Sequence, residues 1–366
     1  GRTAPLGTPS RRGPRQPPAG AGGRAVISGL YARLLEARAR RFASGRALSV
    51  RLPHPVISIG NLTMGGTGKT PLAAHLARRL RFEGKRPAIL SRGYGRRSGG
   101  VVVVSAGDGP LVSAQVGGDE PVALALRLPG VVIVVASRRV EAARAAGELG
   151  ADLFILDDGY QHLAVERDAD LLLLDGRDPF GGGRFPPRGR LREPLSALAR
   201  ADAFIFTRAE RDTPPAEALK ALALWNPVAP VFTARLKPAG LYDEKGAPIE
   251  EAALTGRRFV AVCGVAQPAS FASTLASLDL FPEETLVFRD HQRYAPRDIG
   301  LIHRRAEASG ASWILTTEKD AVKLSGLLRL PLATLRLSVE VAEPGFFPFL
   351  ASRIAAPSAA AVRAGR

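Results

Sequence analysis

From residue 53 onward, short apolar runs alternate with segments whose apolar residues recur at helical spacing. The helical spacing predicts helices over Pro71–Glu83, Glu120–Arg127 and Arg138–Leu149. Strands that are apolar on both faces and separated by helices are typical of a mostly parallel sheet covered by helices. The strand-like runs of this first stretch are Val56–Gly60, Pro87–Ser91, Val101–Val104, Val131–Ala136, Leu153–Leu156, Leu171–Asp175 and Ala203–Thr207.

A second alternating stretch starts near Arg258. Between the two stretches, residues 236–257 are interrupted by glycine and proline and are expected to form a connector. With 366 residues, 46% of them hydrophobic, the chain can build two cores. We therefore expect an α/β fold with a core domain over residues 51–235, a smaller α/β domain over residues 258–350 and a C-terminal tail over residues 351–366. The strands expected in the smaller domain are Phe259–Cys263, Thr285–Phe288, Trp313–Thr316 and Thr334–Val339.

The amino-terminal region has a different composition. Residues 1–23 are rich in glycine, proline and arginine, and we expect them to be disordered. Residues 24–50 are expected to form an amphipathic basic helix, which either lies in a membrane interface or packs on the protein's own core. Its apolar side would carry Ile27, Tyr31, Leu34, Leu35 and Phe42.

Positive charge is concentrated in the same region. Residues 1–52 contain eleven arginines and one acid, Glu36, so they contribute +10 of the formal net charge of +17. Such a segment suits an anionic membrane surface or nucleic acid. Only Tyr31 and Phe42 supply aromatic rings before residue 50, which is too few for stacked bases, so we expect no nucleic acid partner. No apolar run reaches the roughly 18 residues of a membrane-spanning helix, and a single cysteine, Cys263, excludes an internal disulfide.

A glycine-rich loop, Gly65-Gly66-Thr67-Gly68-Lys69-Thr70, follows the first predicted strand and precedes the first predicted helix. Its glycines let backbone N–H groups approach phosphates at a helix N-terminus, so we expect the parallel sheet to be P-loop NTPase-like. Lys69 would reach the β- and γ-phosphates of ATP, and the Thr70 hydroxyl would bind Mg²⁺. The usual spacing has a glycine where this chain has Thr63, and Gly60 lies further back, so we expect a longer or differently folded loop.

Two adjacent carboxylates, Asp157 and Asp158, follow the predicted strand Leu153–Leu156. A P-loop enzyme needs an acid that holds its metal at the end of a neighbouring strand. Adjacent side chains of an extended chain point to opposite sides. We therefore expect Asp157 to hold Mg²⁺ and Asp158 to contact a second site.

Further motifs follow the predicted strands, where parallel sheets gather their ligands. Singly they have ordinary explanations: Asp119 as a helix cap, His291 as a surface histidine, Arg192 and Glu193 as a solvated ion pair. Together, from about Pro53 to Lys323, they resemble the tetraacyldisaccharide 4′-kinase family. The motifs are Gly60-Asn61-Leu62-Thr63, Gly65-Gly66-Thr67-Gly68-Lys69-Thr70-Pro71, Ser91-Arg92-Gly93-Tyr94, Gly118-Asp119-Glu120-Pro121, Asp157-Asp158-Gly159-Tyr160-Gln161-His162, Leu191-Arg192-Glu193-Pro194 and Thr317-Glu318-Lys319-Asp320.

The resemblance implies a kinase that transfers the γ-phosphate of ATP, with Mg²⁺, to the 4′-hydroxyl of a tetraacylated glucosamine disaccharide 1-phosphate, giving lipid IVA. It also implies peripheral or monotopic placement on the cytoplasmic face of a Gram-negative inner membrane. We expect the chain to act as a monomer.

The resemblance also assigns roles to residues, and it pairs Asp119 with His291 as the base that prepares the sugar hydroxyl. A carboxylate orients an imidazole and raises its basicity, which agrees with this role. Because the two residues fall in different predicted domains, domain closure would assemble the pair. The remaining implied roles are phosphate and metal binding by Lys69 and Thr70, metal contact by Asp157 and Asp158, phosphate contact by Arg192 and help to the metal from Glu193.

The main rival is a nucleotide-switched P-loop ATPase or GTPase of the partitioning or metal-insertion type. Those proteins carry a signature lysine just before the glycine pair. This chain has Met64 at that position, which counts against the rival.

Overall fold

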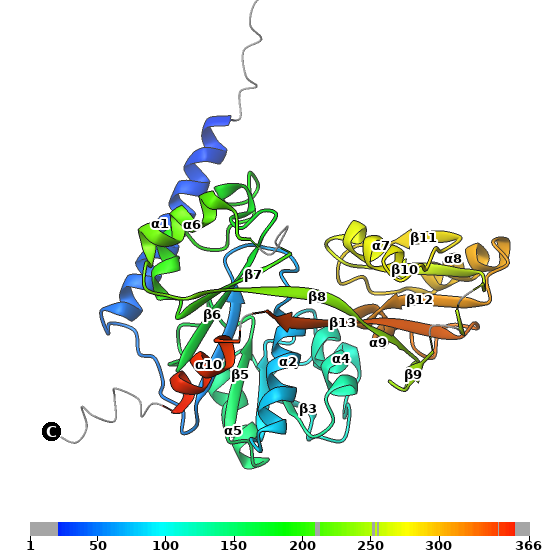
Figure 1. Ribbon diagram of the computed structural model, residues 1–366, viewed down its shortest axis with the longest axis horizontal. Helices are drawn as coiled ribbons and strands as arrows, with labels where there is room; N and C mark the ends of the chain where they lie inside the picture. Colours follow the sequence, from blue (N-terminus) through cyan, green and yellow to red (C-terminus); the bar gives the residue numbers. More distant parts are fainter. Residues whose placement is uncertain (1–20, 209–212, 251–252, 255, 343, 356–366) are drawn as a thin grey trace, which may run out of the picture.

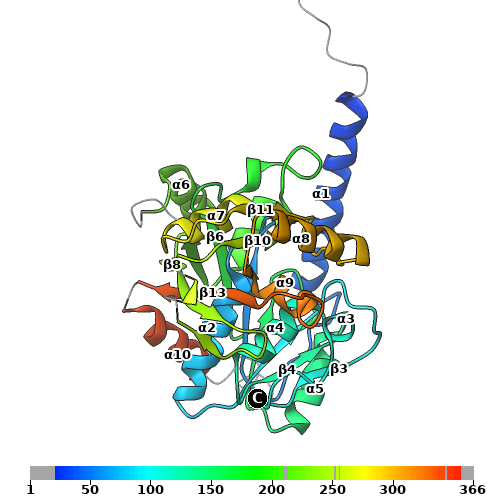
Figure 2. The same ribbon diagram turned by 90° about the vertical axis from the view of Figure 1, so that its right-hand side faces the viewer.

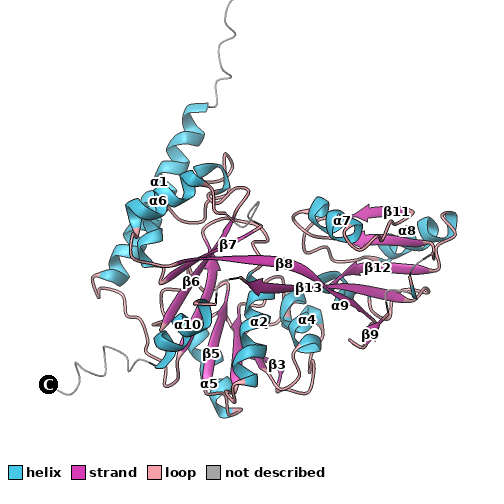
Figure 3. Cartoon of the chain, in the orientation of Figure 1, coloured by secondary structure: helices cyan, strands magenta, loops and turns pink. Residues whose placement is uncertain are grey.

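The computed structural model describes residues 21–208, 213–250, 253–254, 256–342 and 344–355, the first ten of them by backbone alone (Figure 1). One continuous sheet runs through two bodies, in the strand order β11-β10-β12-β13-β8-β7-β6-β1-β5-β2-β4-β3, with β9 paired to β8. Helices cover both faces of the sheet in each body (Figure 3). The fold class is therefore the predicted one, a mostly parallel α/β sheet.

The larger body is built from seven strands that are parallel except for β3, which pairs antiparallel with β4. Its central strands are fully buried, which explains their unbroken apolar sequence. The strands are β1 (Val56–Asn61), β2 (Pro87–Ser91), β3 (Val102–Ser105), β4 (Val132–Val135), β5 (Leu153–Asp157), β6 (Ala169–Asp175) and β7 (Ala203–Thr207).

Two helices of the larger body, α2 and α4, pack on one face of the sheet, and α5 packs on the other. Two further elements, η2 and α6, cover the strand faces beside Tyr160. The bounds are α2 (Lys69–Phe82), α3 (Ala114–Gly117), α4 (Asp119–Arg127), α5 (Arg139–Glu148), η1 (Gly181–Gly183), η2 (Leu195–Arg200) and α6 (Ala216–Trp225).

The smaller body continues the sheet with three parallel strands beside β13. Helix α7 packs on one face, and α8 and α9 pack on the other. The bounds are β10 (Phe259–Cys263), α7 (Pro268–Ala276), β11 (Glu284–Val287), α8 (Pro296–Ala308), β12 (Trp313–Thr317) and α9 (Glu318–Leu324).

The prediction that residues 236–257 form a plain connector is wrong. Strand β8 (Val231–Tyr242) pairs antiparallel with β13 (Leu332–Val341), and this two-stranded ribbon joins the bodies (Figure 1); β9 (Pro248–Ile249) then turns back on β8. Pro238 pairs with Leu337, next to a shift in the register of the two strands. Proline lacks a backbone N–H group, and an irregular position of this kind tolerates that loss, so the strand is not interrupted.

The predicted end of the smaller domain at residue 350 is also wrong. After β13 the chain returns to the larger body, where α10 (Phe346–Ala355) packs against α2 and its neighbouring strands. The ring centroids of Phe346 and Phe232 lie 5.2 Å apart in an edge-to-face contact. Residues 346–355 therefore belong to the core of the larger body, because their apolar cluster is buried there. The rest of the predicted C-terminal tail lies outside the described residues.

Helix α1 (Ala21–Ala43) begins inside the predicted tail and ends before residue 50; residues 1–20 lie outside the described part of the chain. The helix projects from the larger body (Figure 2). Tyr31 contacts Phe185 at a ring-centroid distance of 5.5 Å, and Arg38 donates a hydrogen bond to the Gln161 carbonyl. Leu34 stays 60% exposed, so α1 packs on the protein with only part of its surface. None of the helices in the described residues combines the length and the apolar character needed to cross a bilayer.

Candidate active site

The glycine-rich loop joins β1 to α2, in the strand–loop–helix arrangement of a P-loop. Gly65 and Gly68 have φ values of 122° and 89°, in the region that favours glycine. The Lys69 ammonium at the start of α2 donates a hydrogen bond to Asn61 Oδ1 at 3.1 Å and lies 3.5 Å from Asp158 Oδ1. The lysine is therefore held over the loop by two polar partners.

Gly60, in β1, packs closely against Tyr160. A Cβ at this position would lie 2.4 Å from the Cβ of Tyr160, so only glycine allows the two backbones to approach. Hydrogen bonds to two other segments of the chain hold the loop in place. Met64 N donates to the Arg190 carbonyl at 2.7 Å, and the Thr207 hydroxyl donates to the Thr67 carbonyl at 2.9 Å.

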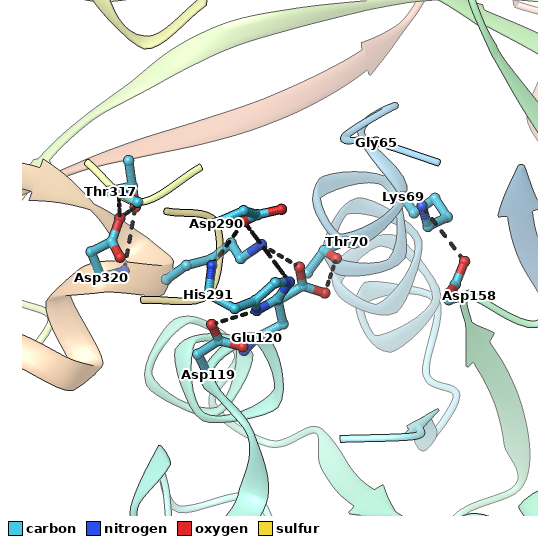
Figure 4. A network of polar contacts seen from close by, with 12 residues as sticks. Gly65, Lys69, Thr70, Asp119, Glu120, Asp158, Asp290, His291, Thr317 and Asp320 are labelled. Carbon is cyan, nitrogen blue, oxygen red and sulfur yellow. Dashed lines mark hydrogen bonds and ion pairs between the residues drawn. The ribbon is translucent and has the colours of Figure 1, made fainter. Parts of the chain in front are cut away.

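A cluster of oxygen atoms surrounds the Thr70 hydroxyl. This hydroxyl lies 3.1 Å from Glu120 Oε2 (Figure 4) and 3.4 Å from Asp157 Oδ2. Asp157 Oδ1 is buried and has no hydrogen-bond partner among the described residues. Burial, together with the charges of Glu120 and Asp158, raises the pKa of Asp157 to about 7. The cluster therefore holds more negative charge than its surroundings neutralise.

These donors fit Mg²⁺, which prefers hydroxyl and carboxylate oxygens. In the described ranges no three His, Cys, Asp or Glu side chains gather into a complete metal cage. Mg²⁺ usually takes most of its ligands from water and substrate phosphates. Glu120 was not predicted as a ligand. The sequence did contain a signal for this role. Glu120 follows Asp119 directly, in the first turn of a helix that starts near the carboxyl ends of the strands.

Asp158 and Asp157 have separate partners, as their opposite directions predict. The Arg192 guanidinium donates to both oxygens of Asp158, at 2.7 and 2.8 Å. Burial alone would raise the pKa of Asp158, but Lys69 and Arg192 lower it below its ordinary value. Asp158 also has a φ of 55°, a strained conformation for a residue other than glycine that is common at functional sites.

Glu193 is placed differently from its neighbour Arg192. Both of its carboxylate oxygens accept hydrogen bonds from Arg200, at 2.8 and 3.1 Å. Arg200 in turn stacks over the Tyr160 ring, 4.5 Å from its centroid. Glu193 thus anchors the packing behind the loop, and its role at the metal stays a prediction without support from this geometry.

The structure brings Asp119 and His291 together across the two bodies. His291 Nδ1 lies 2.9 Å from Asp119 Oδ2 (Figure 4), and Tyr94 covers the imidazole at a ring-centroid distance of 4.8 Å. The hydrogen bond to Asp119 raises the pKa of His291 despite burial. Burial would raise the pKa of Asp119, but His291, Lys319 and Lys323 together lower it to about 2.

Helix α9 carries two lysines whose roles were not predicted. Lys319 Nζ lies 2.9 Å from Glu120 Oε1, 3.5 Å from Asp290 Oδ1 and 3.5 Å from His291 Nε2. Lys323 Nζ lies 2.9 Å from Asp320 Oδ1 and 3.5 Å from Asp119 Oδ2. One turn apart on the same helix face, the lysines tie the smaller body to the first turn of α4.

Comparison with known proteins agrees with this site. The family profile described as tetraacyldisaccharide-1-P 4′-kinase matches residues 24–355. A tetraacyldisaccharide 4′-kinase of Anaeromyxobacter dehalogenans (strain 2CP-C) is 46% identical over 297 residues, 80% of this chain and 78% of that protein. One of Pelobacter propionicus (strain DSM 2379 / NBRC 103807 / OttBd1) is 44% identical over 321 residues, 86% of this chain and 87% of that protein.

Among solved structures, the "apo" form of LpxK from Aquifex aeolicus in complex with ATP superposes with a TM-score of 0.74 at 31% identity. The match covers 91% of this chain and 98% of that one. Fold and sequence therefore agree over nearly the whole described chain. The chain belongs to the tetraacyldisaccharide 4′-kinase family.

Proposed function

We propose that this chain transfers the γ-phosphate of ATP to the 4′-hydroxyl of a tetraacylated glucosamine disaccharide 1-phosphate. As a member of its family, the chain is an ATP-dependent kinase of lipid A biosynthesis. One observation supports the proposed reaction most directly. Asp119, which binds His291, and Glu120, which meets Thr70 of the P-loop, are adjacent residues, so a candidate base stands beside the phosphate loop.

In the proposed mechanism, the P-loop backbone and Lys69 hold the phosphates of ATP. When Mg²⁺ is bound, it supplies positive charge to the transferring phosphoryl group, with Thr70, Asp157 and Glu120 as its protein ligands. Arg192, fixed by Asp158, adds a cation at the same edge of the sheet.

The acceptor hydroxyl must lose a proton as it attacks. With Nδ1–H of His291 donating to Asp119 Oδ2, Nε2 carries the lone pair that accepts that proton, in place of its 3.5 Å contact with Lys319 Nζ. Asp119 then stabilises the imidazolium that forms. Tyr94 also contacts the imidazole, with ring centroids 4.8 Å apart and the rings tilted by 57°.

The substrate is a lipid, and α1 is suited to bring the enzyme to it. The exposed Leu34 and the arginines of α1 would contact an anionic inner-membrane surface, where long basic side chains reach headgroup phosphates. The site needs residues of one chain only, and we propose that the enzyme acts as a monomer at this surface.

The test is an assay with purified full-length chain, ATP, Mg²⁺ and detergent-solubilised disaccharide 1-phosphate, with the 4′-phosphorylated lipid measured directly. We expect Lys69→Ala to abolish transfer with an unchanged circular dichroism spectrum, and chelation of Mg²⁺ to stop the wild type. A wild-type protein that hydrolyses ATP but never phosphorylates the lipid would contradict the proposed function. Normal turnover by Lys69→Ala would remove the P-loop from the mechanism.

A further inference from the structure

Three arginines from two helices line one surface pocket at the end of α2 that lies away from the P-loop. Arg78 and Arg81 come from the last turns of α2, and Arg127 ends α4. Twelve residues at about 1.5 Å each place Arg81 about 18 Å from Lys69 along the helix. The pocket has a volume of about 220 Å³. Its remaining lining residues are Leu128, Pro129 and Val131.

Positive charge in this pocket is poorly balanced. Within the described residues, Arg78 and Arg81 have no carboxylate at ion-pair distance, and Arg127 has only Glu318, at 3.1 Å. Arg127 is 7% exposed, and its Nε is buried without a hydrogen-bond acceptor. Burial lowers the pKa of Arg127, and the charge of Arg78 lowers it further, against the opposing effect of Glu318.

Ordinary explanations account for part of this arrangement. Basic residues are favourable in the last turn of a helix, and exposed arginines are often simply solvated. Neither explanation accounts for a third, buried arginine in the same pocket. The Arg81 guanidinium lies against Gly130, whose φ is 77° and where a Cβ would lie 2.3 to 2.6 Å from it.

We propose that this pocket binds a phosphate group through Arg78, Arg81 and Arg127, at a site separate from the P-loop. Guanidinium groups match the geometry of phosphate oxygens and bind them in pairs of parallel hydrogen bonds. An anion here would offset the charges of the two exposed arginines, Arg78 and Arg81. Inorganic phosphate, a soluble phosphate ester and a phospholipid headgroup share this chemistry.

The test begins with calorimetric titration of inorganic phosphate into the full chain saturated with ADP and Mg²⁺, at constant ionic strength. We expect Arg78→Gln and Arg81→Gln each to weaken the phosphate Kd at least about tenfold, since each removes charge-assisted hydrogen bonds. The control is Arg144→Gln, an exposed arginine on α5, which should leave the Kd unchanged. Both test positions are exposed, so the fold should survive. Phosphate bound at the P-loop would not respond to either variant.

A second arm measures binding of wild type and variants to phosphatidylcholine vesicles with and without phosphatidic acid. A loss of calorimetric binding in Arg78→Gln and Arg81→Gln assigns the pocket to a soluble phosphate. A loss confined to phosphatidic acid vesicles assigns it to a lipid headgroup. The proposal is overturned if both variants behave as wild type in both arms, or if Arg144→Gln shows the same loss.

Discussion

The two residues of the proposed base are 172 positions apart in sequence, and each is held by its own neighbours. Asp119 begins α4 behind Gly118, while His291 occupies a left-handed turn with a φ of 56° after β11. General-base catalysis contributes roughly 10²- to 10⁴-fold, so we expect Asp119→Ala and His291→Ala each to lower kcat within that range. The KM for ATP should change much less, because neither residue belongs to the P-loop.

The double variant distinguishes a working pair from two separate contributions. Residues that act as a unit are non-additive, so the double variant should be scarcely slower than the slower single variant. His303→Ala, at a histidine on α8, is the control and should retain wild-type kcat. Single defects that multiply in the double variant would contradict the pair even if both residues proved important.

The pH dependence of kcat gives the same pair an independent readout. His291 must be neutral to accept a proton, and Asp119 raises its pKa above the ordinary value of 6.5. Activity should therefore fall as the pH decreases through this raised pKa. Asp119→Asn removes the negative charge, so the pKa of His291 should decrease and the acidic limb of the kcat–pH profile should move to lower pH. An unmoved limb would mean that another group controls it.

At the scale of elements, helix α1 shows how a sequence pattern can leave two alternatives open, packing on the protein and contact with a membrane. It packs through Tyr31 on Phe185 and yet keeps Leu34 exposed. We expect deletion of residues 1–43 to weaken binding to anionic vesicles, because each arginine near such a surface contributes about 1 kcal/mol. This deletion keeps Ser49 and Val50, which hydrogen-bond to the chain at Leu163 and Ala164.

A matched variant distinguishes the contribution of positive charge to vesicle binding from that of apolar contact. Arg33, Arg40 and Arg41 changed together to glutamine keep the helix but remove three positive charges. This triple variant should lose most of the salt-sensitive part of vesicle binding, measured by co-sedimentation at two salt concentrations. Vesicle binding by the wild type that is insensitive to salt would point to an apolar docking surface elsewhere.

Elements were predictable where burial makes the sequence unambiguous. Strands β2, β7 and β10 have the predicted bounds because fully buried parallel strands are unbroken apolar runs. Strand β8 was missed because its exposure is irregular and it contains Pro238 and Gly240. Its pairing with β13 depends on a partner about a hundred residues away. No local pattern contains that information.

The same distinction applies to the site. Lys69 and Thr70 were predictable because glycines, lysine and threonine lie on one short loop between a strand and a helix. Contacts of Lys319 with Glu120, and of Arg200 with Glu193, depend on how distant segments pack. The resemblance to the family could pair Asp119 with His291, but the residues that orient this pair became visible only in the structure.

At the scale of the whole molecule, the two bodies are joined by the β8–β13 ribbon and by contacts between α4 and α9. Glu318 lies at the centre of this joint. Its carboxylate binds Arg127 of α4 and Arg336 of β13, each at 3.1 Å, and Arg336 also lies over the Tyr242 ring. Burial raises the pKa of Glu318, although the charges of Arg127 and Arg336 act to lower it. The carboxylate is therefore poorly solvated.

Removal of one charged group from this joint should lower the free energy of unfolding far more than removal of one partner of a surface ion pair. We expect Glu318→Gln to lower the free energy of unfolding by about 3 kcal/mol, measured by urea denaturation, because Arg127 and Arg336 would then be buried without a carboxylate. Glu283→Gln is the control: its pair with Arg258 is exposed and should contribute no more than about 1 kcal/mol.

The double variant Arg127→Met/Glu318→Met tests the reason for that loss. If the loss arises from uncompensated buried charge, the double variant should destabilise the protein less than Glu318→Met alone, since it leaves one buried arginine without a carboxylate instead of two. Arg336 would keep its contact with the Tyr242 ring in this variant. Additive losses from the two single changes would instead show that packing volume, and not charge, holds α9 against α4 and thereby keeps Lys319 and Lys323 at the active site.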